Sequence, residues 1–278
     1  VKDEAKLGSD GRFEAGLPAI GDGQMLFLQN GLKKLKEDGR MAIIQNGSSL
    51  FNGDAGSGPS NIRKHIIEND YLEAIIQLPT DLFYNTGIAT YIWVVTKEKT
   101  NERIGKVQLI DASKCYQKRR KNIGNKRVDL TDECISLIVE AYNSFTDTVI
   151  TKNDILVETK IFDNSYFGFT KVTVETAVVD DNGEKILKKG KPQPQKGKTD
   201  TEIIPLYDDI DLYFEKNVLP FNPLAYMDRS KDKIGYEIPF TRIFYKFVEP
   251  KKSDDIYREI KELEAEETSL MKELFGNE

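Results

Sequence analysis

The sequence predicts an α/β fold, in which helices pack on a largely parallel β-sheet. Four short apolar segments are typical of buried strands, at residues 40–46, 72–78, 88–96 and 106–111. An amphipathic segment precedes each of the first two, and this alternation of helix and strand is typical of layered α/β proteins. The link between Leu78 and Ile88 is too short for a helical crossover. We therefore expect the third strand to run antiparallel to the second.

The two helices that precede these strands are predicted from the spacing of apolar residues. In the first helix, Met25, Leu28, Leu32 and Leu35 follow a 3-4-3 spacing, and Gly39 is a suitable stop after its C-terminus. The second helix covers residues 61–70, with Ser60 as the predicted N-cap. Its inner face is predicted to carry Ile62, Ile66 and Ile67.

The character of the sequence changes after Asp111. Residues 114–127 hold seven basic side chains and no acidic one. Thr131 is predicted to cap a helix that follows this basic run. The inner face of that helix is predicted to carry Ile135, Ile138, Val139 and Tyr142.

The last third of the chain is predicted to be mixed in structure. Strand-like segments at residues 168–179 and 184–189 flank Asn182-Gly183, which is a strong hairpin signal. Residues 189–199, rich in lysine and proline, are expected to form a mobile loop, and residues 202–250 an irregular arm. The tail is predicted to be a helix with a narrow apolar seam of Ile256, Ile260, Leu263, Leu270 and Leu274, interrupted by Glu267. That seam fits docking on a partner helix or packing on its own domain.

Composition narrows the class of protein. The 278 residues include 40 basic and 46 acidic side chains, a net charge of −6, so no global positive field points to nucleic acid, although a local basic patch is compatible with it. The 39% of hydrophobic residues can form a core. No apolar run approaches the roughly 18 residues of a membrane span, and the N-terminus does not resemble a signal peptide. We expect a cytoplasmic protein. Because the first residue is Val1 and not methionine, we also expect part of a longer polypeptide.

Several familiar chemical motifs are absent or incomplete. Cys115, Cys134 and the single His65 cannot build a conventional zinc site, and each is expected to be structural. The glycine-rich loop at residues 53–60 lacks the spacing of a phosphate-binding loop, so we expect a flexible surface loop or lid there. FNPLAY at residues 221–226 has only one proline after its asparagine and no apolar strand before it, so it is not interpreted as a catalytic motif.

The basic run at residues 114–127 is the strongest electrostatic feature. Lysine and arginine side chains neutralise phosphates, and such contacts are independent of sequence and sensitive to salt. A solvated loop is the alternative, since charge runs are often only that. The absence of acidic residues and the presence of Tyr116 within the run make phosphate contact an equal possibility.

Several long blocks in the right order resemble one known family. The block from Gly39 to Lys99, which contains QLPTDLFYNTGIATYIWVV, resembles the C-terminal half of the methyltransferase domain of type I restriction-modification M (modification) subunits. RFEAGLPAIGDGQ upstream, TEIIPLYDDIDLYFEKNVLPFNPLAYMD and IGYEIPFTRIFYKFVEP downstream, and the helical tail are similar to the same family. The resemblance therefore runs nearly from end to end.

The resemblance implies a fold, an activity and partners. The fold would be the distal part of a Rossmann-like methyltransferase sheet plus a mixed C-terminal region that ends in a long helix, with residues 40–46, 72–78 and 88–96 as the fifth, sixth and seventh strands. The activity would be transfer of a methyl group from S-adenosylmethionine to adenine N6 in double-stranded DNA. The partners would be a specificity subunit and, for cleavage, a restriction subunit.

The resemblance also implies what this chain lacks. The cofactor loop and the Asn-Pro-Pro-aromatic motif of the family are expected N-terminal to Val1, because neither occurs in the sequence. We therefore assign no catalytic, cofactor-binding or metal-binding residue to this chain. Most of the S-adenosylmethionine contacts are expected in the missing N-terminal part, and the chain alone is expected to be inactive.

The resemblance places a base-stacking aromatic residue in the loop between the sixth and seventh strands. By motif position it is Phe83, with Tyr84 as the second choice. The alternative is that Phe83 fills the core beneath the loop. Asn85 and Gly87 are expected to shape the loop or approach the DNA backbone. The phosphate contacts predicted for the basic run are Lys118, Arg119, Arg120 and Lys121.

Three regions follow from these expectations. Residues 1–150 would be the end of the catalytic domain, residues 151–250 a β-hairpin and irregular arm, and residues 251–278 a helix that docks on another subunit. Two rival functions remain open. One is a non-catalytic DNA- or protein-binding module on a methyltransferase-like scaffold. The other is a stand-alone DNA methyltransferase of another restriction class.

Overall fold

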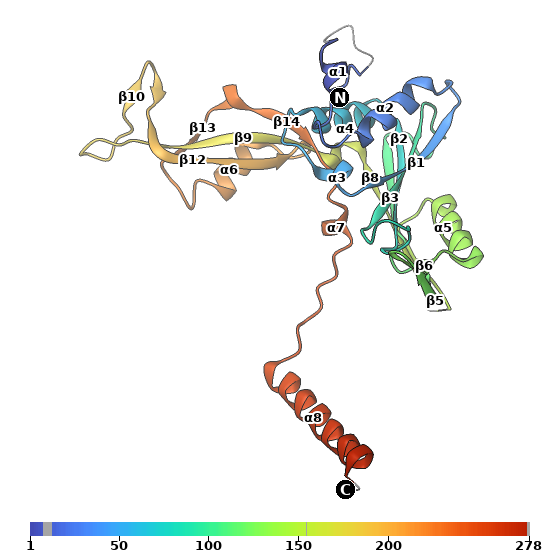
Figure 1. Cartoon of the computed structure of the whole chain (residues 1–278). Helices are drawn as coiled ribbons and strands as arrows, with labels where there is room; N and C mark the ends of the chain where they lie inside the picture. The colour runs from blue at the N-terminus through green and yellow to red at the C-terminus, as the bar shows by residue number, and fades with distance from the viewer. Residues whose placement is uncertain (8–12, 154, 277–278) are drawn as a thin grey trace. The chain divides into compact units, whose positions relative to one another are not determined.

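Figure 1 shows the computed structural model, which describes residues 1–7, 13–153 and 155–276. The chain forms two compact units, residues 1–240 and residues 241–278. The elements are, in chain order, α1 (Lys2–Ala5), α2 (Gln24–Lys34), β1 (Arg40–Asn46), α3 (Ser48–Phe51), α4 (Gly58–Glu68), β2 (Leu72–Leu78), β3 (Thr90–Thr96), β4 (Lys106–Asp111), β5 (Gln117–Ile123), β6 (Lys126–Asp129), α5 (Asp132–Ser144), β7 (Thr148–Lys152), β8 (Ile155–Asp163), η2 (Asn164–Phe167), β9 (Gly168–Ala177), β10 (Leu187–Lys188), β11 (Lys191–Pro192), β12 (Pro194–Pro205), α6 (Ile210–Asn217), β13 (Ala225–Met227), η3 (Arg229–Lys231), β14 (Lys233–Tyr236), α7 (Phe240–Ile243) and α8 (Ser253–Phe275). The predicted α/β class and the long C-terminal helix are confirmed.

The central sheet of the first unit has six strands in the order β1-β3-β2-β4-β8-β7. β3 lies between β1 and β2 and is antiparallel to both, which confirms its predicted direction. The largely parallel sheet predicted from the alternation of elements is wrong, since β2 and β4 form the one parallel pair of this sheet in the described residues. The reason is the short link after β2. It places β3 directly beside β2 and so separates β1 and β2, which run in the same direction.

One face of the sheet is covered by α2, α3 and α4. Trp93 of β3 is fully buried on this face, where its Nε1 donates a hydrogen bond of 3.2 Å to Ser49 Oγ of α3. α2 approaches β1 so closely that a Cβ at Gly31 would lie 2.2 Å from Met41 Sδ. A side chain at this position would displace the end of the Met41 side chain. α2 ends at Lys34, before the predicted stop at Gly39, because Leu35 is already extended.

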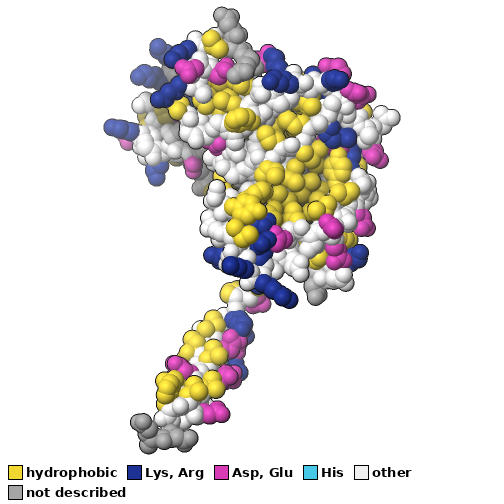
Figure 2. Space-filling view, turned by 45° about the vertical axis from the view of Figure 1, so that its right-hand side comes forward, with side chains coloured by type: hydrophobic (Ala, Val, Ile, Leu, Met, Phe, Trp, Pro, Cys, Tyr) yellow, Lys and Arg dark blue, Asp and Glu magenta, His cyan; other side chains and the backbone are white. Residues whose placement is uncertain are grey.

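The opposite face is covered in part by α5. Thr131 caps this helix as predicted, because its side chain accepts a hydrogen bond from Cys134 N. The inner residues of α5 are Cys134, Leu137, Ile138 and Ala141. The prediction that Ile135 and Val139 point inward is wrong, because their exposed fractions are 48% and 49%. α5 packs on β4, β7 and β8, and beside it these two side chains border an apolar groove of about 370 Å³ with Ala42 of β1 and Ile92 of β3. Figure 2 shows a broad hydrophobic area on this side of the molecule.

A second sheet of four strands is built around β9. β12 pairs with one edge of β9, and β13 and β14 pair with the other. The predicted hairpin between residues 168–179 and 184–189 is confirmed only near its turn, where Val179 and Lys185 form a single antiparallel bridge and Ile186 N donates to Val178 O. Leu187 and Lys188 pair with β11 instead. The lysine- and proline-rich segment predicted to be a mobile loop lies largely in β10–β12. β9 pairs with β12 because their Thr, Val and Ile residues form a longer ladder than residues 184–189 could form.

A buried arginine connects the second sheet to α4. Arg63 is fully buried, and its Nε donates a hydrogen bond of 2.6 Å to Tyr236 O at the end of β14. Ser60 Oγ accepts a hydrogen bond of 2.9 Å from Tyr236 N. The prediction that Ser60 caps α4 is therefore wrong. The helix begins one turn earlier, at Gly58, and Ser60 points inward to β14.

The second unit consists mainly of α8. It is 23 residues long, and none of its residues is buried. The predicted apolar seam is exposed along the helix, with exposed fractions from 44% at Ile256 to 73% at Leu274. No helix in the described ranges is both long enough and apolar enough to cross a membrane.

Candidate nucleic-acid interface

The loop between β2 and β3 turns tightly and carries two adjacent aromatic residues. Asp81 has a left-handed backbone with φ of 57°, and Phe83 and Thr86 form a single β-bridge. Tyr84 and Asn85 therefore occupy the tip of the turn. A Cβ at Gly87 would lie 2.7 Å from Asp81 Oδ1, so a glycine allows the two sides of the loop to approach each other.

The two aromatic side chains of this loop have different environments. Phe83 is partly buried against a small cluster of Leu78, Leu82 and Val128. Tyr84 has an exposed fraction of 58%. Asn85 and Gly87 are exposed beside it. The loop therefore presents the ring of Tyr84 to solvent, while Phe83 contributes to holding the loop in place.

The predicted basic run forms a two-stranded hairpin of β5 and β6. Lys118, Arg120 and Lys121 are exposed, and in the part of the chain that the structure describes none of them forms an ion pair. Arg119 and Lys126 both pair with Asp129, Lys126 at 2.9 Å. The hydrogen bond from Lys126 and the charge of Arg119 lower the pKa of Asp129. Positive charge is therefore concentrated on the remaining cations.

The hairpin and the aromatic loop are joined by backbone hydrogen bonds. Asn125 N donates to Tyr84 O at 2.9 Å, and Arg127 N donates to Asp81 O at 2.8 Å. A Cβ at Gly124, whose φ is 59°, would lie 2.6 Å from Tyr84 O, so the residue at the hairpin turn must be glycine. Figure 1 shows β5 and β6 beside the end of β3. Two features predicted separately from the sequence thus form one surface.

Lys126 contributes to this surface in a way that the sequence did not reveal. Its Nζ donates a hydrogen bond of 3.1 Å to Leu82 O and lies 5.6 Å from the centre of the Tyr84 ring. That distance is within the range of a cation–π contact. Lys126 belongs to the basic run but was not among its predicted contacts. The turn signal Gly124-Asn125 predicts the hairpin of β5 and β6, but no signal in the sequence places Lys126 opposite the loop.

A polar cluster lies at the same edge of the sheet. Asn46 and Leu78, the last residues of β1 and β2, both pair with Thr90 of β3. Beyond Asn46, Gln24 Nε2 donates to Ser48 Oγ at 2.6 Å, and Ser48 Oγ donates to Asp22 Oδ2 at 2.7 Å. The cluster borders a cavity of about 410 Å³. Ligands of open α/β sheets bind at the carboxyl ends of strands, and sequence patterns alone did not indicate these residues.

The remaining candidates are structural. Cys115 and Cys134 are buried, and burial raises the pKa of the Cys115 thiol to about 12. His65 packs edge-to-face on Tyr71 at 6.0 Å. Residues 1–7, 13–153 and 155–276 contain no group of three or more His, Cys, Asp or Glu side chains suited to a metal ion.

Comparisons with known proteins place the chain among DNA methylases. Residues 2–181 match the family model described as N-6 DNA Methylase. The chain is 31% identical over 137 residues to the type I restriction enzyme MjaIX methylase subunit of Methanocaldococcus jannaschii, an alignment that covers 49% of this chain and 23% of that protein. It is 36% identical over 118 residues to the HindI methylase subunit of Haemophilus influenzae, covering 41% of this chain and 25% of that protein.

A solved structure shows a weaker likeness. It is the methyltransferase subunit of a type I restriction-modification system from Streptococcus thermophilus, with 30% sequence identity and a TM-score of 0.49. The match covers 59% of this chain and 32% of that one. In the two sequence alignments this chain spans only about a quarter of the length of its relatives.

Proposed function

The chain belongs to the N-6 DNA methylase family, and from this premise we propose that it is the distal part of a modification subunit of a type I restriction-modification system. In this proposal the full-length subunit transfers a methyl group from S-adenosylmethionine to the N6 amino group of adenine in double-stranded DNA. The similarity to type I methylase subunits supports the system, and the short aligned share of those relatives supports a partial chain.

The role we propose for this chain is to hold DNA at the aromatic loop and the β5–β6 hairpin. The observation that carries the proposal is the pair of backbone hydrogen bonds that join Tyr84 O to Asn125 N and Asp81 O to Arg127 N. They join the loop that presents the Tyr84 ring to the hairpin that carries the uncompensated cations Lys118, Arg120 and Lys121. Aromatic rings stack on unpaired bases, and cations contact phosphates whatever the base sequence.

We propose Tyr84 as the ring that stacks on the flipped adenine, and Phe83 as its support. A base inside a duplex must leave the stack before an enzyme can modify it, and an aromatic face stabilises it outside. The sequence favoured Phe83 for this role. The exposure of Tyr84 and the partial burial of Phe83 support the reverse assignment.

Tyr84→Ala is expected to weaken binding of DNA that has a mismatched, easily flipped target base. Loss of base–aromatic stacking costs roughly 1–3 kcal/mol, about 5- to 150-fold in affinity. Tyr84→Phe keeps the ring and should bind like the wild type. The measurement is fluorescence of 2-aminopurine at the target position in the assembled full-length methylase. Unchanged flipping in Tyr84→Ala, together with a loss in a stably folded Phe83→Ala variant, would return the role to Phe83.

The cofactor S-adenosylmethionine would supply the methyl group. Gly53 and Gly58, in the glycine-rich segment at residues 53–60, lie close to other atoms of the protein. A Cβ at Gly58 would lie 1.8 Å from Leu17 O, and one at Gly53 would lie 2.5 Å from Ser57 Oγ. We therefore place the cofactor site mainly in the part of the full-length subunit that corresponds to the unaligned length of the relatives.

The second unit is proposed to dock on the specificity subunit, and the complex to recruit a restriction subunit for cleavage. α8 has an apolar seam on an otherwise charged helix, and every residue of the helix is at least partly exposed. A seam of this kind is stabilised when a second helix covers it.

Removal of the residues after Pro250 from the full-length subunit is expected to abolish assembly with the specificity subunit. The first unit has its own sheets and buried cluster, so the thermal unfolding of the truncated subunit should be unchanged. Size-exclusion chromatography of the mixed subunits measures assembly. Substitution of the exposed Lys261 and Glu264 pair by alanine is the matched control and should leave assembly intact. Co-elution of the truncated subunit with its partner would contradict the docking role.

A further inference from the structure

A small lysine-rich hairpin lies at the far end of the second sheet. β10 and β11 are joined by the two residues Lys189 and Gly190. We refer to residues 187–192 as the lysine hairpin. It is held to the end of β9 because Ile186 N donates to Val178 O at 2.9 Å and Val178 N donates to Gln193 O at 2.8 Å. The hairpin is therefore a separate two-stranded sheet that these hydrogen bonds attach just beyond the end of β9.

The lysines of this hairpin occupy positions that are unfavourable for the fold. Lys188 and Lys191 are directly opposite each other in the antiparallel register. Like charges in such a pair destabilise a hairpin. Lys189 and Gly190 have φ values of 52° and 77°, as in a type I′ turn, whose first position favours asparagine, aspartate or glycine. Three of the six residues of the lysine hairpin are thus lysines at positions that local structure disfavours.

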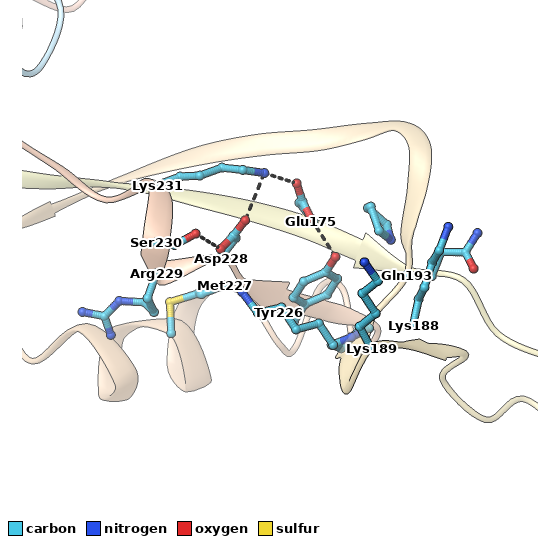
Figure 3. A pocket seen from close by; sticks show the side chains of 13 residues that line it. Glu175, Lys188, Lys189, Gln193, Tyr226, Met227, Asp228, Arg229, Ser230 and Lys231 are labelled. Carbon is cyan, nitrogen blue, oxygen red and sulfur yellow. Dashed lines mark hydrogen bonds and ion pairs between the residues drawn. The ribbon is translucent and has the colours of Figure 1, made fainter.

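Acidic side chains compensate the neighbouring cations but not these three. The hairpin forms one wall of a recess of about 750 Å³. On the other wall, Lys231 Nζ lies 2.8 Å from Glu175 Oε1 and 3.1 Å from Asp228 Oδ2, as Figure 3 shows. Across the chain as described, Lys188, Lys189 and Lys191 form no ion pair. Their charge is available to an external anion.

The distribution of the lysines fits an extended anion. Lys196 and Lys198 are two further exposed lysines on β12, on either side of Gly197, where the register between β12 and β9 shifts. No acidic residue interrupts the segment from Leu187 to Lys198. A single phosphate would be held by one or two of these groups, whereas five cations between Lys188 and Lys198 match the repeating charge of a polyanion.

We propose that the lysine hairpin binds the phosphate backbone of duplex DNA, as a second contact apart from the β5–β6 hairpin. The proposal rests on the proposed function, because it takes its polyanion to be the DNA that the family methylates. The contact is to phosphates alone, so it adds affinity without sequence preference. Bound phosphates would also offset the repulsion between Lys188 and Lys191.

The test is Lys188→Glu, which should affect DNA binding and hairpin stability in opposite directions. A glutamate opposite Lys191 replaces repulsion with attraction, so hydrogen-exchange protection of the amides of residues 188 and 191 should rise. Affinity for a short duplex should fall about 10-fold at roughly 0.1 M salt, because each phosphate contact contributes about 0.9 to the slope of log K against log salt. Lys36→Glu changes the net charge equally at another exposed position, and should bind within about 2-fold of the wild type.

The outcomes separate this proposal from the proposed function. Equal affinities of Lys188→Glu and Lys36→Glu would overturn the lysine hairpin as a DNA contact, while a loss on neutralising the β5–β6 hairpin would leave the proposed function standing. If Lys188→Glu binds more weakly than Lys36→Glu but neutralising the β5–β6 hairpin leaves affinity unchanged, the β5–β6 surface is overturned and the lysine hairpin is retained. A wild-type chain without salt-dependent binding to duplex DNA would overturn both.

Discussion

Replacement of Lys118, Arg120 and Lys121 by glutamine is expected to weaken binding of the chain to duplex DNA on the order of 100-fold at about 0.15 M salt. These three side chains are exposed cations of the β5–β6 hairpin that no acidic group compensates within the described residues. Each lost phosphate contact removes about one unit from the slope of log K against log salt, so the slope should fall by about three. Fluorescence anisotropy over a series of salt concentrations measures both quantities.

The matched control for this variant removes three charges elsewhere. Lys2, Lys34 and Lys36 are exposed and lie outside the hairpin, so their replacement by glutamine gives the same net charge. The control should bind within a few-fold of the wild type, because exposed charges beyond about 10 Å are largely screened. If the control and the hairpin variant lose affinity equally, binding depends on net charge and the hairpin is not the interface.

Arg63→Ala is expected to destabilise the first unit by about 3–5 kcal/mol. Arg63 is fully buried, and it donates hydrogen bonds of 2.6 Å to Tyr236 O and 3.1 Å to Ser49 O. Burial lowers the pKa of Arg63 to about 10, so the guanidinium remains charged at neutral pH. The variant would leave two carbonyl groups without these donors and a cavity between α3, α4 and β14. Urea unfolding monitored by circular dichroism measures the change.

The adjacent residue provides the control for Arg63. Lys64 lies on the same helix and is partly exposed, and its contact with Glu68 is long, at 4.0 Å. Lys64→Ala should therefore change the free energy of unfolding by no more than about 0.5 kcal/mol. Coincident unfolding of the two variants would show that Arg63 does not connect α4 to the second sheet. Loss of stability in Arg63→Ala alone would confirm that it does.

The distribution of charge explains how an acidic protein can present a DNA-binding surface. The net charge of −6 gives no global attraction to DNA. At the β5–β6 hairpin, Asp129 is the acidic partner of Arg119 and Lys126 and leaves the outer cations uncompensated. At the lysine hairpin, Glu175 and Asp228 pair with Lys231 instead of the three lysines opposite. For DNA binding, the local pairing of acidic and basic side chains at each hairpin therefore matters more than the net charge of the protein.

Local patterns in the sequence were sufficient for most elements near the candidate site. Apolar runs predicted β1 to β4, and the short link after β2 predicted the direction of β3. These predictions succeed because the periodicity of buried side chains is a property of a few consecutive residues. The boundaries of α2 and α4 were wrong because tertiary contacts decide them. α2 ends where Leu35 becomes extended, and Ser60 bonds to Tyr236 instead of capping α4.

Strand pairing over long separations was not predictable in the same way. The Asn182-Gly183 turn is a real turn, but β9 pairs with β12, which begins at Pro194. A turn signal reports the conformation of four residues, whereas a ladder depends on the summed contacts of two strands. The orientation of α5 was missed for a related reason. Ile135 and Val139 have apolar spacing but border the apolar groove beside α5 instead of the core beneath it.

The sequence by itself determined the α/β class, the family resemblance, the aromatic loop and the basic run, because each depends on residues that are close together in the chain. The tertiary structure alone decided that the loop and the run form one surface, that Tyr84 and not Phe83 is the exposed ring, and that Lys126 lies over it. These outcomes depend on about forty residues of intervening chain folding back through β4, so that Asn125 and Arg127 reach the loop. Such long-range contacts leave no periodic signal in the sequence.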